Sequence, residues 1–150
     1  SMPAETVPRF LAERKAEALR PSITHEIIIA ADTVVIIDGR VLNKPANADE
    51  AFAMLSMLNG RTHRVVTAVC LMDKQHQRTF ADRTRVTFAR LTDDELRYYI
   101  ERDKPFDKAG SYGAQDWIGM IGISRIEGSY FTVMGMPMHR LYQELKKFDW

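Results

Sequence analysis

Cysteine is almost absent from this sequence, and the few histidines are scattered. The single cysteine, Cys70, excludes an internal disulfide and a cysteine-cluster metal site. It stands in the apolar stretch 65–72, where we expect a small core residue and not a catalytic thiol. The four histidines lack the paired spacing of a zinc-binding HExxH helix, so we expect no histidine-built zinc centre.

An excess of one charge and a long hydrophobic run are lacking as well. Lysine and arginine number 21 against 20 acidic residues, which gives a formal net charge of +1. Proteins that bind nucleic-acid polymers or membrane surfaces usually carry a basic excess, so we expect neither partner. The apolar runs are strand-sized and broken by charges, which predicts no membrane span, no secretory signal and a cytoplasmic location.

The length of 150 residues suits a single domain, and residues 1–150 contain no internal repeat, low-complexity tract or inter-domain linker. Ser1 ahead of Met2 is typical of a remnant left by tag cleavage, so we expect it to have no part in the fold.

A β-branched run from residue 27 to residue 37 predicts a strand covered on both faces. Asp32 and Thr33 interrupt it. An ionised aspartate is costly in such a strand unless it is paired or holds a metal, so Asp32 is a functional candidate. The alternative is a strand end where both side chains make turn hydrogen bonds. Asp38-Gly39 then predicts a hairpin turn, whose return toward Lys44 could bring a cation beside the acid.

A helix is predicted to begin near Thr6 and Pro8, with an apolar face made of Val7, Phe10, Leu11, Ala18 and Leu19. Lys15 is four residues from both Leu11 and Leu19 and therefore lies on that face. One interpretation is that its ammonium group reaches solvent past an apolar stem. The other is that the ammonium group points at an anion in a cleft.

Helices and strands alternate through the rest of the chain. Three more helices are predicted. Asn47 caps the first, and Thr92 with Glu95 caps the second. Pro137 opens the third, which has an apolar face of Met138, Leu141, Tyr142, Leu145 and Phe148. Predicted strands are a hairpin from residue 65 to about residue 88, then residues 117–123 and 130–134.

Residues 103–115 read as a loop, and a loop of this length inside a domain is often functional. Walker A, GxGxxG and GxSxG motifs are absent from the sequence. What remains is a set of cations with a carboxylate and an amide: Asp32, Lys15, Lys44, Lys108, Arg61 and Gln115. This set suits a phosphate-bearing ligand with a divalent metal, although a sugar phosphate or an acidic metabolite would fit about as well.

Several short motifs occur in a fixed order: Ala31-Asp32-Thr33, Lys44-Pro45, Gly60-Arg61-Thr62-His63, the loop DKAGSYGAQ at 107–115, Glu127-Gly128-Ser129-Tyr130 and Gly135-Met136-Pro137. In order and spacing they resemble the Maf family over nearly the whole chain. The DKAGxYGxQ loop downstream of ADT and GRTH is the most specific part of this resemblance.

The resemblance implies an α/β fold related to the inosine triphosphatases, with a mixed twisted sheet flanked by helices and a cleft between two lobes. It implies a nucleoside triphosphate pyrophosphatase that cleaves between the α- and β-phosphates with Mg²⁺ or Mn²⁺. The ADT form resembles the branch that acts on dTTP and UTP. Maf proteins are often homodimers and were first associated with inhibition of septum formation.

By motif position, Asp32 resembles the catalytic acid and metal holder, with Lys44 and Gln115 completing the catalytic set. Lys15 resembles a helix lysine on the phosphate path. The resemblance further implies that Thr33, Arg61, Thr62 and Lys108 support substrate binding.

Maf proteins begin with a strand, an SxSPRR motif and a helix, followed by an acidic metal ligand, and the 150 residues contain none of these. We therefore expect weak or no hydrolysis by this chain alone, because residues that would stabilise the charge of the triphosphate are missing. We also expect an open position in the sheet, where the first strand of other Maf proteins lies. One alternative is a Maf-like domain that binds a nucleotide or a protein in septum formation without turnover. A second alternative is an unrelated phosphohydrolase with Asp32 as its nucleophile. It is disfavoured because no second acidic residue stands two positions from Asp32.

Overall fold

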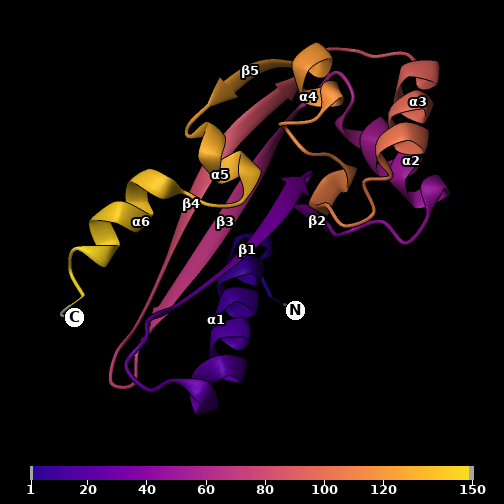
Figure 1. Cartoon of the computed structure of the whole chain (residues 1–150). Helices are drawn as coiled ribbons and strands as arrows, with labels where there is room; N and C mark the ends of the chain where they lie inside the picture. Colours follow the sequence, from indigo (N-terminus) through magenta and orange to yellow (C-terminus); the bar gives the residue numbers. More distant parts are fainter. Residues whose placement is uncertain (1, 149–150) are drawn as a thin grey trace.

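A five-stranded sheet in the order β2-β1-β3-β4-β5 runs through the computed structural model, which describes residues 2–148 (Figure 1). The strands are β1 (Ile28–Ile37), β2 (Arg40–Leu42), β3 (Thr62–Met72), β4 (Gln77–Phe88) and β5 (Ile123–Glu127). Helices flank this sheet, so the predicted α/β class is confirmed. Every pairing between these described strands is antiparallel, whereas the resemblance implied strands of mixed direction.

The strand β1 passes without a break through Asp32 and Thr33, which pair with Ala68 and Thr67 of β3. The alternative of a strand end at this position is therefore wrong. The predicted hairpin turn is confirmed: Asp38 and Gly39 have φ angles of 53° and 71°, as a two-residue turn between β-strands requires.

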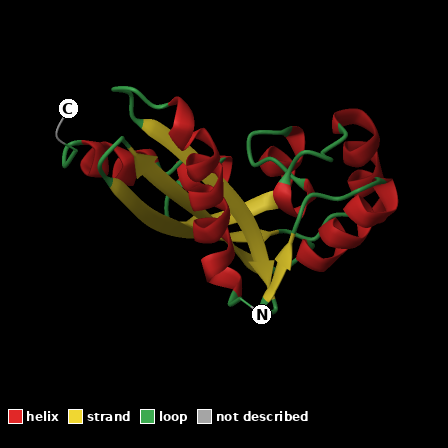
Figure 2. Cartoon of the chain, turned by 90° about the horizontal axis from the view of Figure 1, so that it is seen from below, coloured by secondary structure: helices red, strands yellow, loops and turns green. Residues whose placement is uncertain are grey.

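Helix α1 (Val7–Leu19) packs on one face of the sheet through small residues (Figure 2). Ala12 and Ala16 are fully buried against Ala30, Ala68 and Cys70. Small side chains let the helix backbone approach the strands closely. The apolar face predicted for this helix was therefore wrong in part, since Phe10 and Leu19 are about half exposed.

A lobe of three helices covers one end of the sheet: α2 (Ala48–Leu58), α3 (Asp93–Asp103) and α4 (Trp117–Gly122). Its predicted caps are confirmed. Asn47 accepts a hydrogen bond from the Glu50 amide, and Thr92 and Glu95 form a capping box. The lobe buries Leu55, Leu58, Leu96, Tyr99 and Ile118.

The strands predicted over 117–123 and 130–134 are wrong, because both segments are short helices, α4 and α5 (Tyr130–Met134), joined through β5. Tertiary packing decides the first. A Cβ on Gly119 would lie 1.9 Å from the Ala114 carbonyl oxygen, so only glycine lets this turn of helix sit against the preceding loop. Ser129 caps α5, and Gly135, with a φ of 114°, ends it.

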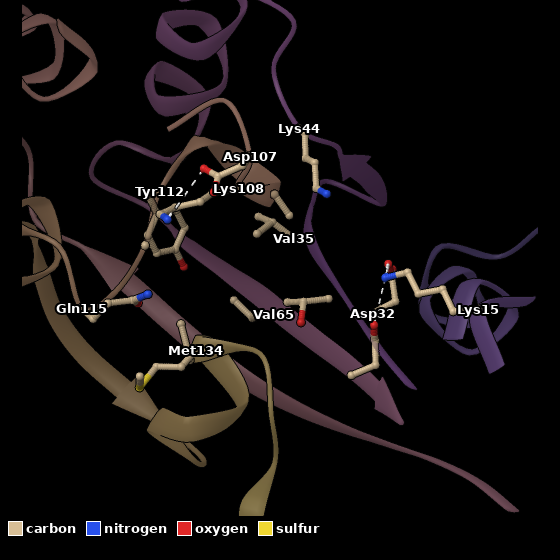
Figure 3. A pocket seen from close by; sticks show the side chains of 15 residues that line it. Lys15, Asp32, Val35, Lys44, Val65, Asp107, Lys108, Tyr112, Gln115 and Met134 are labelled. Atoms are coloured by element: carbon tan, nitrogen blue, oxygen red, sulfur yellow. Dashed lines mark hydrogen bonds and ion pairs between the residues drawn. The ribbon is translucent and has the colours of Figure 1, made fainter. Parts of the chain in front are cut away.

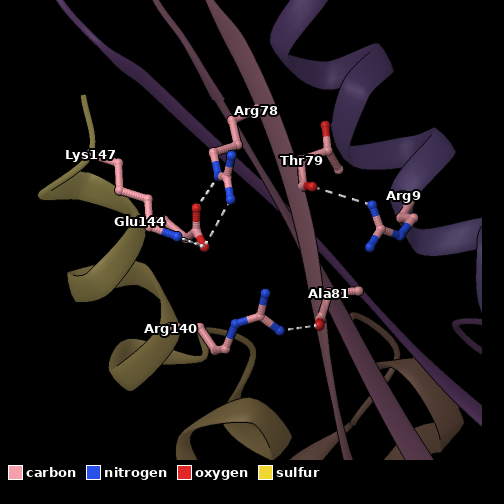
Figure 4. Close-up of polar contacts among 7 residues, drawn as sticks. All are labelled: Arg9, Arg78, Thr79, Ala81, Arg140, Glu144 and Lys147. Carbon is pink, nitrogen blue, oxygen red and sulfur yellow. Dashed lines mark hydrogen bonds and ion pairs between the residues drawn. The ribbon is translucent and has the colours of Figure 1, made fainter. Parts of the chain in front are cut away.

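Helix α6 (Met138–Leu145) lies against β4 and follows Pro137 as predicted. From Gln77 to Thr84, on the N-terminal side of Arg85, β4 has no β5 partner. Guanidinium groups bind outward carbonyl oxygens of this stretch: Arg9 donates to Thr79 O and Arg140 to Ala81 O (Figure 4). Such capping protects an open strand edge from pairing with another chain.

The apolar face predicted for α6 was wrong in part, because Leu141 is buried whereas Met138 and Tyr142 are exposed. Glu144 is the buried polar residue of this helix, and it is held by Arg78 and Lys147. The hydrogen bond from Arg78 keeps the pKa of Glu144 below its usual range. No helix within residues 2–148 has the length and apolar character needed to cross a membrane.

Candidate active site

A cavity of about 260 Å³ lies where β1, α1, the loop after α3 and α5 meet (Figure 3). Six of the eight residues singled out from the sequence line it: Lys15, Asp32, Thr33, Lys44, Lys108 and Gln115. The other walls are largely apolar and include Val35, Val65, Tyr112, Val133 and Met134. The cavity therefore joins a charged side to an apolar side.

Asp32 and Thr33 point to opposite faces of β1, because side chains alternate along a strand. Asp32 faces α1, and the Lys15 ammonium group lies 2.9 Å from its Oδ1 atom and donates to Ala31 O at 2.9 Å. The side chain of Lys15 is 54% exposed and that of Asp32 is 16% exposed. Of the two interpretations of Lys15, the structure supports the one in which its head meets an anion.

The cavity reaches both faces because the edge of β1 is open there. The strand β2 pairs with β1 only from Val35 to Ile37, so no strand within residues 2–148 covers the edge beside Asp32 and Thr33. Lys44 follows β2 and contributes to the cavity from that side, while Lys108 and Gln115 lie across from it (Figure 3). The hairpin thus returns a cation to the cavity that holds Asp32.

The loop that carries Lys108 and Gln115 is pinned against β1 by glycine. Gly110 has a φ of 68°, and a Cβ there would lie 2.8 Å from Val35. Its amide donates to Asn43 O at 3.3 Å, and the next residue, Ser111, also has a positive φ of 71°. A backbone this constrained holds the loop in one conformation.

The far end of the loop is held by Tyr99 of α3. Its hydroxyl donates to the Asp116 carboxylate at 2.8 Å and accepts from the Gly113 amide at 3.2 Å. Burial, with the neighbouring Asp116 carboxylate, raises the pKa of Tyr99, which keeps this hydroxyl protonated. Gln115 is therefore anchored on both sides.

A buried pair that sequence reasoning missed supports the cavity wall: the Tyr112 hydroxyl lies 2.6 Å from Nε2 of His63. Burial lowers the pKa of His63 to about 4, so its ring is neutral at pH 7. The His63 Nδ1 atom has no hydrogen-bond partner within the described part of the chain. His63 was visible only as the last letter of the GRTH motif, because a lone buried histidine gives no spacing signal.

Two predicted residues lie outside this cavity. Arg61 binds the Asp38 carboxylate at 2.6 Å, and the Thr62 hydroxyl lies 2.8 Å from that of Thr87. Val133 and Met134, in contrast, line the cavity and were missed, since α5 was predicted as a strand and neither residue carries a chemical signal.

Three lysines line the cavity together with two carboxylates, Asp32 and Asp107, and the Gln115 amide, and such a set suits a ligand with several negative charges. The sequence model of one family, described as Maf-like protein, matches residues 1–148. The chain belongs to the Maf family. The motif residues Asp32, Lys44 and Gln115, far apart in the sequence, are thus three walls of one cavity in a Maf protein.

Relatives of this Maf protein carry one activity in their names. The chain is 54% identical to the dTTP/UTP pyrophosphatase of Porphyromonas gingivalis. The match extends over 147 residues, which are 96% of this chain and 74% of that protein. It is 53% identical to the dTTP/UTP pyrophosphatase of Phocaeicola vulgatus and 46% identical to that of Bacteroides fragilis, in each case over 98% of this chain and 77% of the relative.

Proposed function

We propose that this Maf protein hydrolyses the α–β phosphoanhydride of dTTP and UTP, releasing a nucleoside monophosphate and pyrophosphate. The observation that carries the proposal is the convergence of Lys15, Lys44 and Lys108 on a cavity that also holds Asp32 and Gln115. The names of the relatives supply the choice of nucleotide.

In the proposed reaction, the oxygen of a water molecule attacks the α-phosphorus, and the bond from that phosphorus to the bridging oxygen breaks. Pyrophosphate leaves with the electron pair. Asp32 accepts the proton from the attacking water, and the ammonium group of Lys15, 2.9 Å away, stabilises the ionised carboxylate before it takes that proton. Lys44 and Lys108 neutralise phosphate oxygens, and Gln115 donates to one of them.

A divalent metal is part of the proposal, since the resemblance to Maf pyrophosphatases implies Mg²⁺ or Mn²⁺. Among residues 2–148 no three acidic, histidine or cysteine side chains gather, yet two carboxylates, Asp32 and Asp107, line the cavity. Mg²⁺ is commonly held by one or two carboxylates together with substrate phosphates, so the donors fit a metal that arrives with the nucleotide. Such an ion would neutralise charge on the phosphate oxygens.

The test is product analysis with the purified protein, dTTP or UTP, and Mg²⁺ in H₂¹⁸O. We expect pyrophosphate and a monophosphate that carries the ¹⁸O, with loss of turnover in EDTA. Release of inorganic phosphate, or label in the pyrophosphate, would contradict attack at the α-phosphorus. Nucleotide that raises the melting temperature without any product would instead support binding without turnover.

We further propose that the protein is a homodimer, as the resemblance to the Maf family implies. Light scattering coupled to size exclusion tests the dimer, and a mass of one 17.2 kDa chain would contradict it.

A further inference from the structure

A second cavity, of about 320 Å³, lies at the end of the sheet where β3 begins with the GRTH motif. Its lining includes Ile36, Asp38, Thr62, Arg64 and Arg85, and it shares no lining residue with the candidate active site. The proposed reaction uses none of these residues. This arginine cavity is therefore a separate place on the molecule, and its charges need an explanation of their own.

Two guanidinium groups line the arginine cavity from neighbouring strands. Arg64 of β3 and Arg85 of β4 are direct cross-strand partners, so their side chains leave the sheet side by side on one face. Like charges placed directly opposite each other destabilise a pair of strands. An anion between the two guanidinium groups would remove this repulsion.

The carboxylates on this face of the sheet are already engaged. Glu5 accepts hydrogen bonds from Arg64 and from Arg83, each at 2.7 Å, so one carboxylate serves two arginines. Glu127 of β5 binds Arg125 at 3.1 Å. Two carboxylates therefore serve three guanidinium groups.

Arg85 is the fourth guanidinium group of this face, and it has no ion-pair partner among residues 2–148. Glu127 stands opposite it in the pairing of β4 with β5, but the Glu127 carboxylate is the one that binds Arg125. The Asp38 carboxylate accepts from Arg61 at 2.6 Å, and these two charges cancel. Four guanidinium groups against two carboxylates leave two positive charges at the cavity.

A hydroxyl donor completes the lining. The Oγ1 atoms of Thr62 and Thr87 lie 2.8 Å apart across the two strands, next to Arg64 and Arg85 on the same face. Only one of their two hydrogens lies between these oxygens, so the other is left to donate elsewhere. A phosphoryl group offers three strong acceptor oxygens, one for each guanidinium fork and one for the hydroxyl.

From this arrangement we infer that Thr62, Arg64 and Arg85 form a second anion site, which binds the phosphoryl group of a small anion such as pyrophosphate or a nucleotide. Two surplus positive charges suit one such anion, whereas a nucleic-acid backbone is bound by a longer row of cations. The inference is independent of the proposed function, because no residue of the active-site cavity takes part in it.

The test is protection of the arginines from phenylglyoxal, read for each arginine by peptide mass spectrometry, with pyrophosphate as the probe. At ten times its dissociation constant, Arg64 and Arg85 should react roughly tenfold more slowly, because only the free site reacts. Arg102 of α3, which is also exposed, is the internal control and should react at an unchanged rate. Among residues 2–148 no arginine lines the active-site cavity, so pyrophosphate bound there does not alter this readout.

The reference sample contains NaCl at the same ionic strength, because salt alone screens exposed charges. If Arg64 and Arg85 reacted equally fast with pyrophosphate and with NaCl, the inference would be overturned. UMP as a second probe separates the two sources of the phosphoryl group. Protection by pyrophosphate alone assigns the site to the free anion, and protection by UMP as well extends it to nucleotides.

Calorimetry gives the dissociation constant and a second, independent measurement. Pyrophosphate is titrated into Lys44→Met, which weakens binding in the active-site cavity, and into the same variant with Arg85→Gln added. Arg85→Gln should weaken the remaining binding roughly tenfold, because charge-assisted hydrogen bonds are lost. Arg102→Gln in the same background is the matched control for net charge and should bind like Lys44→Met. Equal affinities in the two double variants would contradict the site.

Discussion

The ammonium group of Lys15 and the carboxylate of Asp32 lie 2.9 Å apart, joined across the contact between α1 and β1. Lys15 is more than half exposed, so this ion pair contributes little to the free energy of unfolding, about 1 kcal/mol or less. The ion pair matters for the cavity, because it places the cation of Lys15 beside Asp32, the acid that interrupts the apolar strand β1. Activity and stability should therefore respond differently when either partner is changed.

Asp32→Asn keeps the shape of the side chain and removes its charge. We expect turnover of dTTP to fall at least 100-fold, because the group that accepts the proton is lost, while the melting temperature stays within a few degrees. Asp38→Asn is the matched control, since Asp38 pairs with Arg61 outside the cavity and asparagine tolerates its positive φ. Equal losses in both variants would speak against a special role for Asp32.

Lys15→Met retains the length of the stem and removes the charge. KM for dTTP should rise roughly tenfold because a cation on the phosphate path is lost, with the urea midpoint nearly unchanged. Arg14→Met removes a neighbouring cation on α1 that stacks on Phe10, so it controls for net charge. If the two variants raised KM equally, general attraction and not position would be the cause.

The pH dependence of stability should report on His63. Its pKa is about 4 when folded and near 6.5 when unfolded, so the unfolded chain binds more protons between these values. Stability is therefore lost as the pH falls from about 6.5 toward 4, by ~2–3 kcal/mol from this group. Urea titrations from pH 7 to pH 4.5 measure this loss.

The double variant His63→Phe with Tyr112→Phe removes both partners of that buried hydrogen bond and the unpaired Nδ1 atom. We expect its stability at pH 7 to stay close to the wild type, since replacing both partners leaves no polar group unsatisfied. Its stability should vary less with pH. A pH slope as steep as that of the wild type would assign the effect to other groups.

Gly119→Ala should lower the free energy of unfolding by several kcal/mol. The added Cβ would lie 1.9 Å from the Ala114 carbonyl oxygen, a backbone atom that cannot move aside without shifting the loop. Gly39→Ala is the comparison. Gly39 has a φ of 71°, but in the described part of the chain, its two sequence neighbours aside, no atom lies within 4 Å of the added Cβ, so the substitution costs only backbone strain of about 1 kcal/mol. Similar losses from both substitutions would show that packing at Gly119 is loose.

The local structure was largely readable from the sequence. Turn chemistry at Asp38-Gly39, capping at Asn47 and Thr92, and the β-branched run around Asp32 each depend on residues close in sequence, and each prediction was confirmed. The motifs also identified the family. Six of the eight site residues predicted from the sequence line one cavity. Charged and amide side chains that bind the same ligand must lie close together in the fold, however far apart they are in the sequence.

Only the tertiary structure decided the rest. The helical state of 117–122 depends on Gly119 against a carbonyl five residues earlier, and the buried face of α1 depends on how near alanine lets it approach the sheet. Arg61 carries the positive charge expected of a residue that binds phosphate, yet in the folded chain it forms an ion pair with Asp38. The Thr33 hydroxyl lies 2.8 Å from that of Thr67, which donates to the Thr132 backbone oxygen, so residues from β1, β3 and α5 meet in a contact that no local pattern contains.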